Sequence, residues 1–129
     1  MELALRSALV AWLAADPMLA AELNAVVEEA PLRTSLPWLA IAASASADWS
    51  VKDLPGREVR VALELHCRGD APESAVALVR AIEARVEALP PDQPGFAIAS
   101  CQFLRARSEQ LGESRRLVLI EYRFRLLAN

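Results

Sequence analysis

The stretch EVRVALELHCR, residues 58–68, decides the fold. Apolar side chains occupy every second position, namely Val59, Val61, Leu63, Leu65 and Cys67. The positions between them carry mostly charged or polar groups: Glu58, Arg60, Ala62, Glu64, His66 and Arg68. Successive side chains of a strand point to opposite faces of a sheet, so this period of two predicts a strand with one buried and one solvated face.

A helix is predicted directly after this strand. The sequence Gly69-Asp70-Ala71-Pro72 forms a turn, and a helix follows from about Glu73 to Leu89. The helix has an apolar stripe at spacings of three and four residues, formed by Ala75, Val79, Ile82, Val86 and Leu89. Pro90-Pro91 ends it.

Two further strands are predicted at the C-terminal end. The first runs from Phe96 to Arg107, with a turn at Leu111-Gly112-Glu113, and the second runs from Arg115 to about Leu127. In the second strand the side chains expected to face inward are Val118, Ile120, Tyr122, Phe124 and Leu126. Glu121, Arg123 and Arg125 are expected to face outward.

The N-terminal half begins with two helices. The first is predicted from Glu2 to Ala15, and Asp16-Pro17 caps a second that reaches Leu23. A short edge strand is expected at Ala25–Glu29, with Pro31 at its exit, and another strand at Trp38–Ser44, entered through Leu36-Pro37. The segment from Ala45 to Gly56 is expected to be a long polar loop.

Together these elements predict one α+β domain over residues 1–129. The expected order is α-α-β-β-β-α-β-β. Strands joined by hairpins and one crossover helix favour a mostly antiparallel sheet of four to five strands, with helices packed on one face.

The charge and composition exclude several classes of protein. The net charge is −3 and the pI is near 5.2, which argues against a general nucleic-acid binder. The longest charge-free stretch has 14 residues, shorter than the roughly 20 of a membrane span, so no membrane partner is expected. Two cysteines are too few for a disulfide scaffold and indicate a reducing, cytoplasmic compartment.

No catalytic, cofactor or metal site is predicted. His66 and Cys67 are neighbours in a strand, so they point to opposite faces and cannot act as a nucleophile–base pair. His66 is expected to be solvated, and Cys67 and Cys101 to be inert core thiols. Glu83 and Glu87 are interpreted as part of a solvated helix face.

The candidate functional residues lie in the polar loop and on the C-terminal hairpin. Residues 1–100 carry eight basic and fourteen acidic side chains, whereas residues 101–129 carry six and three, a division that suits copies meeting acidic face to basic face. Trp49 is the one tryptophan without a local pattern that buries it. The candidate subunit or tube interface is Asp48, Trp49, Ser50, Lys52, Arg105, Arg107, Arg123 and Arg125.

The ordered segments resemble a known family. They are Asp16–Ala21, Leu36-Pro37-Trp38-Leu39, Asp48-Trp49-Ser50, the alanine-rich helix Ala75–Leu89, Phe103–Arg107 and Tyr122-Arg123-Phe124-Arg125. In this order and spacing the chain resembles the phage tail-completion family, which includes tail terminators of siphophages and gene transfer agents. Ala25-Val26-Val27-Glu28 departs from the Arg-Val-Tyr-like strand usual in that family.

The resemblance implies a structural role in a phage, prophage or gene transfer agent tail. Such a protein would form a homo-oligomeric ring, a hexamer in the family's typical form, at the head-proximal end of the tail, after assembly in the cytoplasm. Its partners would be itself, the tail tube protein and a head connector or stopper protein, with DNA passing through without sequence-specific binding. Alternatives are another connector component (a stopper or adaptor), a small ligand-binding α+β domain and a nucleic-acid-binding module.

Overall fold

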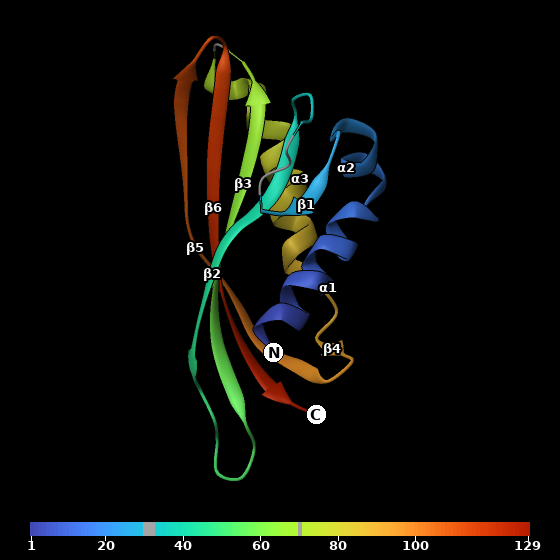
Figure 1. Ribbon diagram of the computed structural model, residues 1–129, viewed down its shortest axis with the longest axis vertical. Coiled ribbons are helices and arrows are strands. Elements are labelled where there is room, and N and C mark those ends of the chain that lie inside the picture. Colours follow the sequence, from blue (N-terminus) through green and yellow to red (C-terminus); the bar gives the residue numbers. More distant parts are fainter. Residues whose placement is uncertain (30–32, 70) are drawn as a thin grey trace.

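The computed structural model describes residues 1–29, 33–69 and 71–129 (Figure 1). The helices are α1 (Glu2–Ala14), α2 (Pro17–Glu22), the 3₁₀ turn η1 (Pro72–Ala75) and α3 (Val76–Glu87). The strands are β1 (Val26–Glu28), β2 (Trp38–Asp48), β3 (Gly56–Arg68), β4 (Asp92–Gln93), β5 (Phe96–Gly112) and β6 (Arg115–Ala128). Within the described residues these strands form one sheet in the order β1-β2-β3-β6-β5-β4. β1 runs parallel to β2, and the other neighbours are antiparallel.

The centre of the sheet is the pair β3 and β6. They are in continuous register from Gly56 opposite Leu127 to Arg68 opposite Arg115. The predicted inward side chains are buried: Val59, Val61, Leu63, Leu65 and Cys67 in β3, and Val118, Ile120, Tyr122, Phe124 and Leu126 in β6. The alternation read from the sequence therefore gave the correct buried face for both strands.

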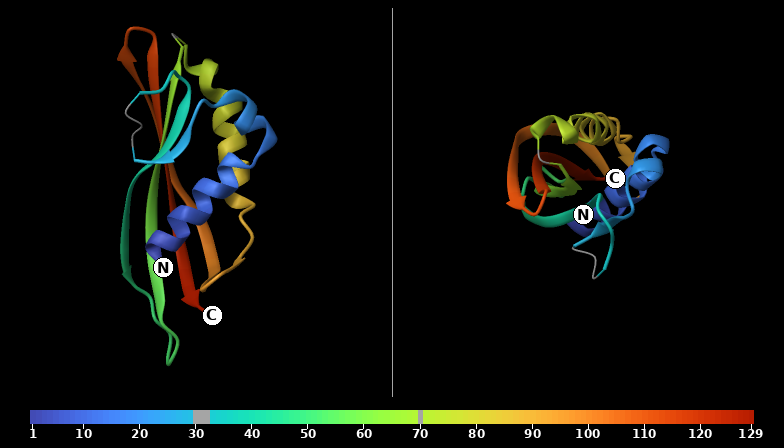
Figure 2. Two further views of the ribbon diagram at one scale, coloured as in Figure 1. Left: turned by 45° about the vertical axis from the view of Figure 1, so that its right-hand side comes forward. Right: turned by 90° about the horizontal axis from the view of Figure 1, so that it is seen from above.

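The helices cover one face of the sheet (Figure 2). α1 contributes Leu5, Leu9 and Leu13 to the core, and α3 contributes Ile82 and Val86. The Asp16 carboxylate accepts a hydrogen bond from the Leu19 amide at 3.0 Å, which confirms the predicted cap of α2.

A reciprocal contact joins α1 to α3. The Trp12 indole donates to the Arg85 carbonyl at 2.7 Å, and Arg85 Nε donates to the Trp12 carbonyl at 2.8 Å. The Arg85 guanidinium also lies 3.4 Å from the centre of the Trp12 ring. These contacts hold the two helices side by side over the sheet.

The sheet is strongly twisted. In Figure 1 the left-to-right order of β2, β3, β6 and β5 is reversed between the top and bottom of the molecule. The β5–β6 turn lies at the top end and the β2–β3 loop at the bottom end. The molecule is thus elongated, with a different hairpin at each end.

The α+β class, the antiparallel sheet and the helix placement are as predicted, but several boundaries differ. β2 continues to Asp48, so the predicted loop at Ala45–Gly56 is shorter and its first four residues are strand. β5 continues to Gly112, and the turn is at Glu113 and Ser114, which both have positive φ. That conformation matches the twist of the flanking strands.

Smaller differences concern the short elements. β4 has only two residues and was not predicted, which makes six strands where four to five were expected. The crossover helix begins as the 3₁₀ turn η1 before α3. The parallel edge strand β1 lies within the predicted span Ala25–Glu29, whereas the predicted exit at Pro31 falls outside the described residues.

Candidate assembly surface

The four predicted arginines lie on the sheet face that the helices leave uncovered, here called the outer face. In the register, Arg123 faces Gln102 and Arg105 faces Glu121, while Arg125 and Arg107 occupy equivalent positions further along the strands. Side chains of directly paired residues point to the same face. The hairpin β5–β6 therefore presents all four arginines on one side, and the outward direction of Arg123 and Arg125 is as predicted.

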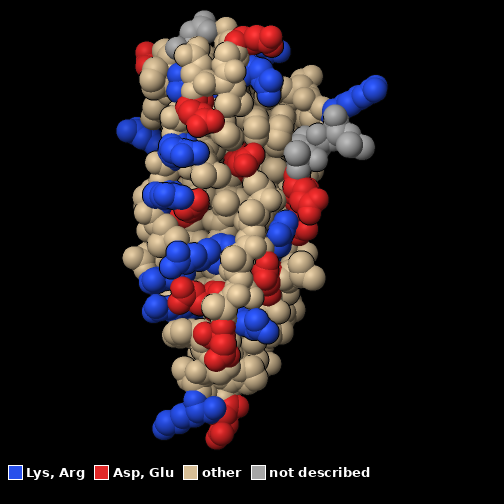
Figure 3. All heavy atoms as spheres, turned by 60° about the vertical axis from the view of Figure 1, so that its left-hand side comes forward, with Lys and Arg blue, Asp and Glu red and all other residues tan. Residues whose placement is uncertain are grey.

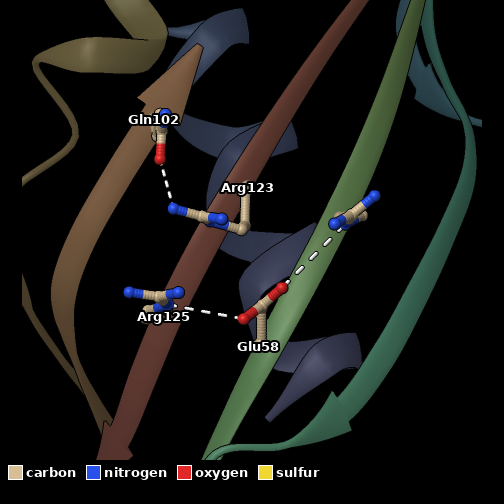
Figure 4. A network of polar contacts seen from close by, with 5 residues as sticks. Glu58, Gln102, Arg123 and Arg125 are labelled. Atoms are coloured by element: carbon tan, nitrogen blue, oxygen red, sulfur yellow. Dashed lines mark hydrogen bonds and ion pairs between the residues drawn. The ribbon is translucent and has the colours of Figure 1, made fainter. Parts of the chain in front are cut away.

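Arg123 and Arg125 are held in a network of polar contacts (Figure 4). Arg125 Nε lies 3.4 Å from a carboxylate oxygen of Glu58 in β3, and the same carboxylate group is 3.9 Å from Arg60. Arg123 donates to the Gln102 side-chain oxygen of β5. Both arginines are partly buried, so they are fixed across three strands rather than freely solvated.

Arg105 and Arg107 are more exposed. Arg105 donates two hydrogen bonds to Glu121, at 2.7 and 3.2 Å, and these bonds raise the pKa of its guanidinium. Arg107 is 3.8 Å from Glu109 on its own strand. Basic and acidic groups are interleaved on the side of the molecule seen in Figure 3. On this side the arginines alternate with carboxylates instead of forming the continuous basic stripe expected of a nucleic-acid-binding module.

The β2–β3 loop, residues 49–55, is here called the tip loop. It is closed by its own hydrogen bonds: the Ser50 hydroxyl donates to Asp48 at 2.7 Å and accepts from the Gly56 amide at 3.1 Å. The Trp49 amide donates to the Gly56 carbonyl at 3.0 Å. A Cβ atom on Gly56 would lie 2.4 Å from the Trp49 carbonyl oxygen, so only glycine fits this closure.

The structure brings part of the predicted site together. Trp49 is half-buried, and the Arg125 guanidinium lies 5.5 Å from the centre of its ring. Asp48 and Ser50 are the neighbours of Trp49 in the chain, whereas Lys52 lies further along the loop and has a positive φ. Arg105 and Arg107 lie farther along β5, nearer the other end of the molecule.

Sequence reasoning missed the partners of these residues. Glu58, Gln102 and Glu121 join the site through cross-strand pairing, and a strand register cannot be read from one strand alone. For Glu58 a usable signal was present, since it lies on the same outward side of its strand as Arg60.

One residue predicted to be solvated, His66, is instead packed. The His66 ring stacks on Trp38 with centroids 3.9 Å apart, and its Nε2 is 3.0 Å from the Glu64 carboxylate. Trp38 stands directly opposite His66 in the register, and the large ring covers the imidazole. The expectation of a solvated His66 is therefore wrong.

Glu87 is exposed, as predicted, but it also has a buried hydrogen-bond partner. Its carboxylate accepts a hydrogen bond from the buried Tyr122 hydroxyl at 3.0 Å. Burial and this bond raise the pKa of Tyr122, while burial and Glu87 raise the pKa of the Cys101 thiol to about 11. Burial also raises the pKa of Cys67. Both thiols are therefore weak nucleophiles at neutral pH.

Among residues 1–29, 33–69 and 71–129, no group of three or more His, Cys, Asp or Glu side chains is arranged to hold a metal ion. In the same residues no helix is both long and apolar enough to cross a bilayer.

Comparison with known proteins gives the following relations. Residues 7–127 match the model of the family described as Tail completion protein gp17. No curated protein matches the chain. A solved structure with a similar chain is the virion of a native gene transfer agent particle, with a TM-score of 0.75 and 22% sequence identity. The similarity covers 98% of this chain and 96% of that chain, and it shows that the two share a fold.

Proposed function

Because this chain belongs to the tail completion protein gp17 family, we propose that it is a tail terminator, a ring-forming protein that caps the tail tube. The observation that carries the proposal is the family match over residues 7–127. Membership of this family makes the chain a structural component of a tail rather than an enzyme.

The ring would be a homohexamer at the head-proximal end of a phage, prophage or gene transfer agent tail. There it would stop growth of the tube and join the tail to the head connector, leaving a passage for DNA. Residues 1–129 would act as a single domain. The fold shared with a chain of a gene transfer agent virion supports this placement.

The candidate interface supports a role in assembly. The tip loop projects from one end of the molecule, and its half-buried Trp49 is backed by Arg125. Tryptophan and arginine are the side chains most enriched among interface hot spots. We therefore assign contacts with neighbouring ring or tube subunits to Asp48, Trp49, Ser50, Lys52, Arg105, Arg107, Arg123 and Arg125.

Reconstitution on tail tubes tests the proposal. Purified protein is added to tail tube protein polymerising without a terminator, and tube lengths and ends are recorded by electron microscopy. A terminator shortens the tubes and leaves a six-fold ring at one end. Unchanged tubes with bare ends, together with binding to the head connector alone, would replace the terminator with a stopper or adaptor role.

A further inference from the structure

The far half of β5 pairs with β6 along one edge but is exposed on both faces and along its other edge. Residues 105–112 are all exposed, although alternate side chains point to opposite faces of the sheet. β4 pairs with β5 only at Phe96 and Ala97, so the edge beyond is unpaired by any other described strand. Phe103 and Leu111 are exposed apolar residues of this strand. A strand bare on both faces and along its edge is a surface for association.

A groove runs between this half of β5 and the start of α3. Its volume is about 360 Å³, in the range of about 300–1,000 Å³ typical of binding pockets. Its apolar wall includes Val76, Val79 and Ala106, with the buried Val118 also lining it. Two charged residues of α3, Arg80 and Glu83, line it as well.

The tip loop carries side chains complementary to those of the groove. Val51 and Leu54 are 42% and 41% exposed, and their backbones bond to each other at 3.0 and 2.7 Å. Lys52 and Asp53, one charge of each sign, lie between them. The loop is therefore a compact knob with two aliphatic side chains and a charge pair.

The groove and the knob cannot meet within one chain. The tip loop lies at the bottom of the molecule in Figure 1, while the start of α3 and the far half of β5 lie near the top. We propose that the tip loop of one copy binds in the α3–β5 groove of the next copy. Val51 and Leu54 then cover Val76 and Val79, Lys52 meets Glu83, and Asp53 meets Arg80.

This contact is heterologous, because two different surfaces of the same chain meet. Such contacts generate a ring when the rotation between copies closes, and an open filament when it does not. The inference rests on the proposed ring, for which it supplies the subunit contact. It also explains why the exposed aliphatic pair and the bare strand occur at opposite ends of one molecule.

Disulfide trapping between two singly substituted proteins tests the contact. Val51→Cys and Val76→Cys lie at exposed positions, whereas the native Cys67 is buried and Cys101 is half-buried. The two proteins are mixed under mild oxidation, alone at high concentration and with tail tubes present. We expect a crosslinked Val51→Cys–Val76→Cys dimer. The matched control pairs Val51→Cys with Leu3→Cys, a position 73% exposed but outside the groove.

Charge exchange provides a second test. Lys52→Glu should weaken crosslinking and ring formation at least several-fold, because it places the new carboxylate next to Glu83 of the neighbouring copy. When every copy carries both Lys52→Glu and Glu83→Lys, crosslinking and ring formation should be restored. Crosslinking no better than the Leu3→Cys control, or no rescue by Glu83→Lys, would overturn the tip-in-groove contact.

The two proposals fail in different ways. If rings cap tail tubes while Val51→Cys and Val76→Cys do not crosslink, the terminator role holds and this contact is wrong. If the two cysteines crosslink in solution but tube ends stay bare, the contact holds and the terminator role is wrong.

Discussion

The guanidinium of Arg125 lies 5.5 Å from the centre of the Trp49 ring, and the same side chain is 3.4 Å from the Glu58 carboxylate. One β6 arginine thus links the tip loop to the central strand β3. The position of Trp49 is set by the rigid sheet, although the residue belongs to a loop. A preorganised aromatic side chain loses little conformational freedom on binding, which suits an interface.

Trp49→Ala should separate assembly from folding. The contact with Arg125 contributes about 0.5–1 kcal/mol, so the isolated protein should melt only a few degrees lower. Capping of tail tubes should be lost. Trp12→Ala is the contrasting variant, because it removes the contact between α1 and α3 and should lower the melting temperature more. A large fall in the melting temperature of Trp49→Ala would place Trp49 in the core.

Leu63→Ala tests the register of β3. Leu63 is 1% exposed in the centre of the sheet, and the cavity should lower the free energy of unfolding by about 2–5 kcal/mol. Denaturant unfolding measures the change. Leu3→Ala, at an exposed position of α1, should change stability by less than about 0.5 kcal/mol. An equally small effect at Leu63 would contradict the register.

Arg123→Gln together with Arg125→Gln should weaken assembly with little effect on the monomer. Neutral variants are needed because a glutamate at position 125 would lie beside Glu58 and disturb the fold itself. The partly exposed pair of Arg125 and Glu58 contributes at most about 1 kcal/mol. Arg60→Gln is the matched control, since Arg60 contacts the same carboxylate but lies outside the candidate interface.

Light scattering and capping assays measure this effect. We expect fewer rings with the double variant and unchanged rings with Arg60→Gln. Unchanged assembly in both proteins would show that Arg123 and Arg125 serve only the intramolecular network.

Tyr122 should make stability fall at alkaline pH. Burial and the Glu87 hydrogen bond raise its pKa above the ordinary value of 10.0, so the folded state retains a proton that the unfolded chain releases. The free energy of unfolding is unaffected below about pH 10 and decreases above it. Because the chain has one tyrosine, phenolate absorbance reports this group alone.

The phenolate signal should appear only as the backbone circular dichroism is lost. In Glu87→Gln it should appear at lower pH, since the charge that opposes ionisation is gone. Titration near pH 10 with intact secondary structure would contradict the buried hydrogen bond.

The sequence pattern correctly predicted the elements that have one buried face and one solvent-exposed face. Val59 to Cys67 and Val118 to Leu126 alternate strongly, and Asp16-Pro17 carries its own cap. Prediction from the sequence failed where the two faces of a strand do not differ in this way. The residues of β2 beyond Ser44 are Ala, Ser, Ala and Asp, too small and polar to show a period. β5 beyond Arg107 is exposed on both faces, so it has no pattern to read.

The sequence suggested which residues belong to the candidate site, but it did not predict which residues they contact. The outward direction of Arg123 and Arg125 followed from strand alternation, whereas no direction was predicted for Arg105 and Arg107. Their partners depend on which strands are neighbours, and that is set by the whole sheet. The stacking of His66 on Trp38 and the bond from Tyr122 to Glu87 join segments distant in sequence, so local patterns could not show them.

The uninterrupted pairing of β3 with β6 has a mechanical consequence. These two strands run from the tip loop to the β5–β6 turn, and their hydrogen bonds lie perpendicular to the strand direction. A force applied between the two ends of the molecule would load these bonds in shear, all at once, instead of opening them one by one. A subunit held at both ends by its neighbours would therefore resist stretching through its central, uninterrupted pair of strands.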